Sequence, residues 1–201
     1  MLIMILGLVL FLGTHSFSMA RERRAAVIGQ VGEAKYKLGY TLASVLGLVL
    51  IVVGYGHYRA TGYVPVWDPP VFTKHLALLL VLLAFIVMAS AYLPGRIRAF
   101  AKHPMLLAVK IWATAHLLAN GDLGSIVLFA AFLAWAVVDR ISVKRRAVPA
   151  GAVAQQHGGQ AAPSGGRNDI LAVVIGLAAW FVFARYLHPL LIGVPVWPGQ
   201  A

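Results

Sequence analysis

The sequence predicts an all-α membrane protein, a six-transmembrane-helix bundle with both termini on the periplasmic side. Hydrophobic residues make up 61% of the 201 residues and charged residues only 11%, too few to cover the surface of a soluble domain. The apolar residues form long uninterrupted blocks, as membrane-spanning helices require. Most of the charges behind the net +11 lie in segments that flank these blocks, so the net charge indicates a membrane boundary and not a nucleic-acid partner.

The apolar blocks define six expected spans, each justified by its length and by the residues that bound it. The first carries its arginines after the apolar run, the reverse of a signal peptide, and is read as a retained helix with its N-terminus outside. The third stops at Pro94-Gly95, and the fourth starts at Pro104, which suits the first position of a helix. The expected spans are residues 2–19, 38–57, 71–93, 104–120, 123–139 and 170–192.

The lysines and arginines set the orientation of these spans. The segments after the first, third and fifth spans hold five, three and five of them, thirteen in all, against two in the loops of the opposite side. Basic loops stay in the cytoplasm. The thirteen are Arg21, Arg23, Arg24, Lys35, Lys37, Arg96, Arg98, Lys102, Arg140, Lys144, Arg145, Arg146 and Arg167, and the two are Arg59 and Lys74.

The chain is expected to divide into three parts. Residues 1–142 form a five-helix membrane core, residues 143–168 a flexible cytoplasmic linker rich in glycine, alanine and proline, and residues 169–201 the sixth helix with a periplasmic tail. The sequence Val-Pro-Val-Trp occurs at 64–67 and again at 194–197, each time after an outward-running helix that ends near a histidine, His57 or His188. Both copies are expected to be interfacial anchors, since tryptophan favours the headgroup level.

The stretch at 102–142 is the expected centre of function. It is predicted to be a helical hairpin that turns at Asn120, Gly121 and Asp122, with Gly121 left-handed and Asp122 as the cap of the next helix. Trp112, His116 and Asn120 recur every four residues and share one face. A histidine and an asparagine on one stripe of a membrane helix are costly unless something binds them.

Histidines from separate helices form the candidate binding set. Counted from the span ends, His75, His116 and His188 each lie about one turn inside the outer face, whereas His15 lies near the cytoplasmic end of the first span. This pattern suits bis-histidine ligation of a haem, and hydrogen bonds between helices are the alternative. Arg185 precedes His188 by three residues and is expected on the same face. It either snorkels outward or pairs with an anion such as a haem propionate.

Three sequence features together resemble a known family. They are GTHSFSMARERRAA at 13–26, HPMLLAVKIWATAHLLANGDLGSIVLFAAFLAWAVVDRIS at 103–142 and the six-span pattern. In these the chain resembles the bacterial NnrU family of integral membrane proteins, over nearly its whole length apart from the linker. The resemblance implies a bacterial inner membrane location and an association with denitrification, near functions for nitrite and nitric oxide reduction. The family is also similar to the plant 15-cis-ζ-carotene isomerase, a membrane protein that uses haem b to isomerise a polyene double bond.

Carried over residue by residue, the resemblance implies haem b with His15 and His116 as its axial ligands. His15 lies in a Thr-His-Ser context, and His116 ends the run Trp-Ala-Thr-Ala-His, in which Ala113 replaces the family's cysteine. The depth count favours other partners for His116, because His15 lies about 10 Å nearer the cytoplasm. We therefore rank His116 first, His15 and His75 next, and then His188.

Two functions follow as expectations. The first is a haem b-binding protein of nitrite and nitric oxide metabolism; as an enzyme it would be a haem-dependent isomerase of a polyene or isoprenoid-like lipid, with an apolar small molecule as substrate. The second is a non-enzymatic assembly or transport factor for nitric oxide or nitrite reductase components, with structural histidines. The expected surroundings are the lipid bilayer, and the predicted membrane segments lack the carboxylates of a proton-coupled transporter.

Overall fold

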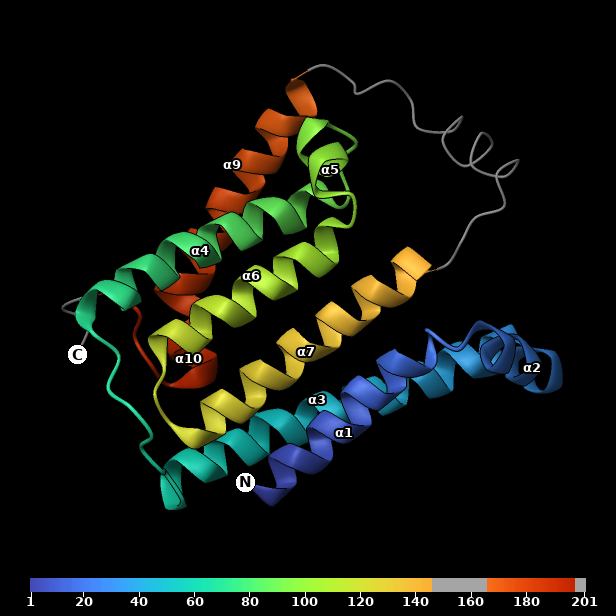
Figure 1. Cartoon of the computed structure of the whole chain (residues 1–201), viewed down its shortest axis with the longest axis horizontal. Coiled ribbons are helices and arrows are strands. Elements are labelled where there is room, and N and C mark those ends of the chain that lie inside the picture. The colour runs from blue at the N-terminus through green and yellow to red at the C-terminus, as the bar shows by residue number, and fades with distance from the viewer. Residues whose placement is uncertain (146–165, 198–201) are drawn as a thin grey trace. The chain divides into compact units, whose positions relative to one another are not determined.

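Helices account for all the regular structure that the computed structural model describes, which comprises residues 1–145 and 166–197 (Figure 1). Its only β feature in these ranges is an isolated bridge between Pro65 and Asp122. The contacts divide the chain into unit 1, residues 1–68 and 120–143, and unit 2, residues 69–119 and 144–201. The helices are α1 (Leu2–Phe17), α2 (Arg21–Val31), α3 (Glu33–Thr61), α4 (Val71–Ser90), α5 (Arg96–Ala101), α6 (Pro104–Ala119), α7 (Leu123–Arg145), α9 (Arg167–Val182), η1 (Phe183–Leu187) and α10 (His188–Ile192).

Four to five of these segments are candidate membrane spans by length and composition. The helices α3, α4, α7 and the continuous run from Arg167 to Ile192 qualify by themselves. Helix α1 qualifies as a bent pair with α2, which turns away from it by 90°, and α6 is apolar but only 16 residues long. A multi-pass membrane protein is therefore supported, while the sixth span and the periplasmic termini stay predictions.

The expected loop between the first two spans is mostly helical. Helix α2 begins with Arg-Glu-Arg-Arg-Ala-Ala, which are mostly strong helix formers. It ends at Gly32, whose φ of +85° favours glycine. Helix α3 then starts at once, supported by an ion pair of 2.7 Å between Glu33 and Lys37 one turn apart. The second membrane helix therefore begins five residues before the expected boundary.

The core of unit 1 is an antiparallel contact between α1 and α3, which run side by side (Figure 1). Three glycines let the two backbones touch. A Cβ atom at Gly7 would lie 2.6 Å from the Ile51 nitrogen, and one at Gly47 would lie 2.8 Å from the Phe11 nitrogen. Gly54 meets the backbone of Met4 in the same way. Close packing of small residues is how membrane helices associate without a hydrophobic driving force.

The segment 64–67 ties the end of α3 to the start of α7 within unit 1. The Val66 and Trp67 amides donate to the Gly121 carbonyl at 2.7 and 3.0 Å, and the Leu123 amide donates to the Val64 carbonyl at 2.9 Å. The carboxylate of Asp122 accepts from the Ser125 amide at 2.9 Å, so the predicted helix cap is confirmed.

The expectation of a left-handed Gly121 is wrong. Positive φ among the described residues occurs at Lys102, Gly32 and Gly193 only. The turn at Gly121 is shaped instead by the two hydrogen bonds that its carbonyl accepts from the segment 64–67. Helix α6 belongs to unit 2 and α7 to unit 1, so the predicted pairing of these two helices stays a prediction.

Unit 2 is built around α4, which packs against both α6 and α9. Gly176 of α9 admits the backbone of Ile86, since a Cβ there would lie 2.6 Å from the Ile86 Cα. At the start of α9, the Asp169 carboxylate accepts from the amides of Arg96 and Ile97 at 3.1 and 2.9 Å. The neighbouring Asn168 side chain donates to the Pro94 carbonyl at 2.6 Å. Asp169 thus caps α5 from a distant part of the chain.

The last predicted span contains a π-helical turn, η1, which the sequence analysis did not anticipate. Pro189 lacks an N–H, and its ring collides with the carbonyl four residues earlier in an α-helix. The chain widens just before this proline, and such single π turns are frequent at functional sites. The turn also changes the angular spacing between Arg185 and His188, on which their expected common face rested.

The expected division at residue 142 stays a prediction. Helix α7 continues to Arg145 and α9 begins at Arg167, so the helices extend into both ends of the expected linker. The part of that linker at residues 146–165 lies outside the described residues.

The glycine contact predicts a sharp difference between two alanine substitutions on α3. Gly54→Ala places a methyl group against the Met4 backbone and should lower the stability of the protein by about 1–3 kcal/mol. Gly56→Ala is the matched control, because nothing lies within 4 Å of a Cβ there. Thermal unfolding in mild detergent measures both. Equal unfolding temperatures for the two variants would contradict the close contact.

The distant cap predicts that Asp169→Ala destabilises unit 2. Removal of the carboxylate leaves the Arg96 and Ile97 amides without their acceptors and should cost about 1 kcal/mol, as for other helix caps. Asp68→Ala is the control, because Asp68 is an exposed residue. Hydrogen exchange at the two amides should accelerate in the Asp169 variant alone. Unchanged protection there would show that the cap is unimportant.

Candidate functional site

Three of the four predicted site histidines share one hydrogen-bond arrangement. The Nδ1–H groups of His15, His116 and His188 donate to the backbone carbonyls of Phe11, Trp112 and Val194 at 2.7, 2.8 and 2.7 Å. A carbonyl can only accept, so each proton is on Nδ1 and the lone pair of each neutral ring is on Nε2. Metal-ligating histidines are usually oriented by this kind of bond from the other ring nitrogen.

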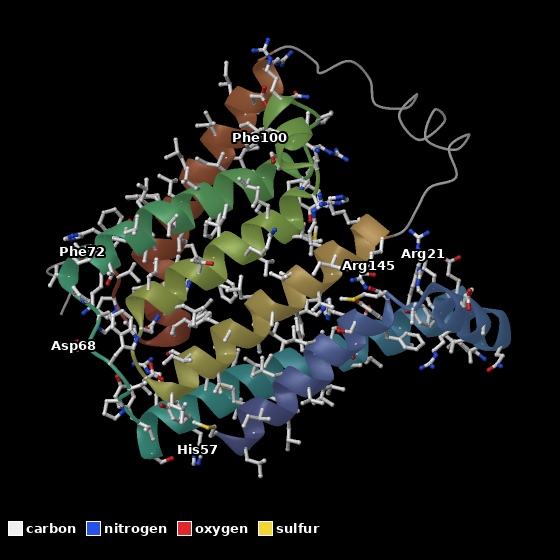
Figure 2. The ribbon with its side chains drawn as sticks, in the orientation of Figure 1. Arg21, His57, Asp68, Phe72, Phe100 and Arg145 are labelled. Carbon is white, nitrogen blue, oxygen red and sulfur yellow. The ribbon has the colours of Figure 1, made fainter. Side chains whose placement is uncertain are left out.

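His75 and His57 differ from these three. His75 is exposed on α4 and makes no hydrogen bond within the described residues. His57 is also exposed, on the outside of α3 (Figure 2), with its Nε2 at 3.4 Å from the Thr61 hydroxyl. In the part of the chain that the structure describes, neither ring donates to a backbone carbonyl. Of the four predicted histidines, His75 has the least structural support.

His15 lies in an aromatic cluster of unit 1. Its ring stacks on Phe11 of α1 at 4.2 Å between centroids. It is tilted by 57° against the Tyr40 ring of α3 at 5.4 Å and meets Trp135 of α7 edge-on at 5.8 Å. Tyr36 lies one turn before Tyr40, with the two rings 6.2 Å apart. We call these five residues the His15 cluster. The close packing of α1 on α3 places them together.

The His15 cluster contains two buried polar atoms without a partner, the Tyr36 hydroxyl and the Trp135 Nε1–H. Buried polar groups are nearly always hydrogen-bonded, and the exceptions call for an explanation. The sequence analysis missed Tyr36, Tyr40 and Trp135. The signal was weak: tyrosines four residues apart share a helix face, but which helix they meet depends on the α1–α3 register.

His116 occupies the predicted stripe of α6 in unit 2. Its ring lies 5.0 Å from that of Trp112, so these two predicted neighbours do meet. Ala113, in the position of the family's cysteine, is fully buried. His116 and His188 both belong to unit 2.

His188 closes the C-terminal loop of unit 2. Its bond to Val194 spans a turn made by Gly193, whose φ is +73°, and brings Trp197 back against Trp180 at 5.4 Å between ring centroids. Arg185 is exposed in the π turn, with its guanidinium 5.2 Å from the Tyr186 ring. Its expected pairing with a propionate stays a prediction.

Each of the two Val-Pro-Val-Trp segments is held by a hydrogen bond to a side chain six residues earlier. In the second, His188 bonds to the backbone of the valine six residues later. In the first, the Tyr58 hydroxyl accepts from the Val64 amide at 3.0 Å, again six residues later. Tyr58 and not His57 is thus the counterpart of His188. The segments close loops in addition to any role as interfacial anchors.

The predicted pairing of His15 with His116 on one haem is not tested. The two belong to different units. Among the described residues, no three or more histidine and acidic side chains gather as a metal cluster. What the structure supplies is separate histidine environments, the His15 cluster in unit 1 and the surroundings of His116 and of His188 in unit 2.

Comparison with known proteins identifies the family. The family model described as NnrU protein matches residues 3–196, which is nearly the whole chain. No curated protein and no solved structure matches.

The hydrogen bonds predict the tautomer of each histidine. In protein labelled with ¹⁵N at histidine and without bound metal, His15, His116 and His188 should show a protonated Nδ1 and an unprotonated Nε2. Exposed His75 should show the tautomer mixture of a free imidazole. Nitrogen chemical shifts, assigned with single histidine substitutions, measure this. A protonated Nε2 on neutral His15 would contradict the proposed orientation.

Proposed function

The chain belongs to the NnrU family, and from that premise we propose that it is a membrane protein that binds haem b through histidine. We assign His15 in unit 1 and His116 in unit 2 as the ligand residues. These are the two histidines that the family resemblance names, and both have the hydrogen-bond arrangement of a metal ligand.

The Nδ1–H bonds are the observation that carries this proposal. Each bond is made to a carbonyl of the same helix, one turn earlier, so the ring orientation is fixed without any other helix. The proton stays on Nδ1, which keeps Nε2 as the basic atom and strengthens it as a ligand. Rotation of the ring would break the bond, so the lone pair keeps its direction.

The surroundings of His15 also fit the ring of a haem. Phe11, Tyr40 and Trp135 present apolar faces and edges around the half-buried imidazole. A bound haem b supplies a Lewis-acidic, redox-active iron. The residues of the chain contribute the ligand nitrogens, their orientation and an apolar environment, which together govern ligand exchange and reduction potential.

We place the biological role in nitrite and nitric oxide metabolism, as the family association implies. Nitric oxide is small and uncharged, and an isoprenoid-like lipid is apolar, so either reaches a membrane site from the bilayer. A cis-polyene isomerase is the second candidate, favoured by the similarity of the family to the plant carotene isomerase. The buried Ala113, in place of the family's cysteine, removes any role that a thiolate plays there.

Histidine substitutions test the haem proposal. The full-length protein is purified from haem-sufficient cells in mild detergent, and its haem b is measured as the pyridine haemochrome. His15→Ala and His116→Ala should each lose most of the haem, because each removes a ligand. His75→Ala and His57→Ala are matched controls, which should keep it because both rings are exposed and neither donates to a carbonyl of the described residues.

Two outcomes contradict the proposal. Full haem content in both His15→Ala and His116→Ala would remove these residues as ligands. A wild-type protein free of haem after supplementation would remove the cofactor, and the non-enzymatic assembly role in nitric oxide or nitrite reduction would take its place. That role predicts co-purification with a reductase subunit.

A further inference from the structure

Two hydrogen-bond donors in the His15 cluster lack an acceptor. The Trp135 Nε1–H can only donate, and the Tyr36 hydroxyl donates readily. Both atoms are buried, and no described residue bonds to either. They come from different helices, α7 and α3. The Trp135 ring meets His15 edge-on, and the Tyr36 ring lies 6.2 Å from Tyr40, which itself contacts His15. A buried donor left unpaired costs about 1–3 kcal/mol, so two in one cluster indicate an acceptor that arrives with a ligand.

A positive charge lies at the same end of the cluster. Because α1 and α3 are antiparallel, Tyr36 lies beyond His15, beside Phe17 at the end of α1, with the two rings 6.5 Å apart. The guanidinium of Arg24, on the exposed helix α2, is 5.5 Å from the centre of the Tyr36 ring. This is also the end of unit 1 where the sequence predicts the basic cytoplasmic loop.

Two acidic side chains lie near the cluster in the sequence. Glu33, three residues before Tyr36, is paired with Lys37 at 2.7 Å, and the pKa of its carboxyl is held below its usual value by that lysine and, more weakly, by Arg24. Asp139 lies one turn after Trp135 on α7. An anion that enters the cluster would therefore bind toward Arg24 and away from Asp139.

We propose that the His15 cluster binds a carboxylate, held by the Tyr36 hydroxyl and the Trp135 Nε1–H and attracted by Arg24. The inference rests on the proposed function, because haem b offers an iron for the Nε2 of His15 and propionate carboxylates on the same molecule. Charge-assisted bonds from N–H and O–H to a carboxylate are among the stronger hydrogen bonds in proteins. The cluster thereby fixes which edge of a bound haem faces the basic end of unit 1.

The test compares haem b with its dimethyl ester, which keeps the iron and the ring but lacks the carboxylate charges. Full-length apoprotein in mild detergent is titrated with each, and the Soret absorbance gives the dissociation constant. Three substitutions are made, Tyr36→Phe, Trp135→Phe and Arg24→Gln. Their matched controls are Tyr92→Phe, Trp67→Phe and Arg21→Gln; the Tyr92 and Trp67 side chains are exposed, and Arg21 shares the exposed helix α2.

The wild type should bind haem b at least about tenfold more tightly than the ester, the effect of one hydrogen bond to a charged group. Tyr36→Phe and Trp135→Phe should each weaken haem b binding about tenfold and leave ester binding unchanged. Arg24→Gln should weaken haem b binding by less than tenfold, because Arg24 is exposed. Its effect should become smaller still at high salt, which screens exposed charges. The three controls should match the wild type with both compounds.

Equal affinity of the wild type for haem b and the ester would overturn the carboxylate site while leaving haem binding intact. Equal losses for both compounds in Tyr36→Phe and Trp135→Phe would do the same, since that pattern reports packing alone. Arg24→Gln keeps the test decisive if a cluster variant fails to fold, because Arg24 is exposed and its change does not disturb the core. Failure of the wild type to bind either compound would instead overturn the proposed function itself.

Discussion

The backbone contact between α1 and α3 is the constraint on which the candidate site in unit 1 depends. Gly7, Gly47 and Gly54 allow the two helices to touch along their length and fix their antiparallel register. That register sets His15 opposite Tyr40 and Phe17 near Tyr36. In a membrane, where lipid is as apolar as leucine, such a contact depends on shape. A shift by one turn would separate His15 from Tyr40 and dismantle the cluster.

Local hydrogen bonds also shape the candidate sites, because they orient the histidine rings without contacts from other helices. His15 and His116 each donate to the carbonyl one turn earlier, and His188 donates across a glycine turn. Both units therefore present imidazoles with the lone pair on Nε2. Since the bonds lie within single segments, they form however the two units assemble. The candidate ligands are thus local features of the chain, and pairing on one iron would be a property of the assembly.

Much of the fold follows from the sequence where a local rule decides. Pro104 begins α6, Asp122 caps α7, and the apolar blocks are helical as expected. The failures arise where distant contacts decide. The turn at Gly121 is shaped by the segment 64–67, and the aromatic partners of His15 come from α3 and α7. An irregularity near the π turn could have been predicted, because a proline inside an apolar span, here Pro189, indicates a break in the helix.

The central claim is that this NnrU-family protein presents its histidines to the iron of haem b. The most direct measurement is the absorption spectrum of the wild-type protein, oxidised and then reduced with dithionite, after purification in mild detergent from haem-sufficient cells. Haem b with histidine ligands predicts a strong Soret band and sharp α and β bands on reduction, the signature of two nitrogen ligands. A spectrum without a Soret band after haem supplementation would contradict it and leave the histidines as structural groups.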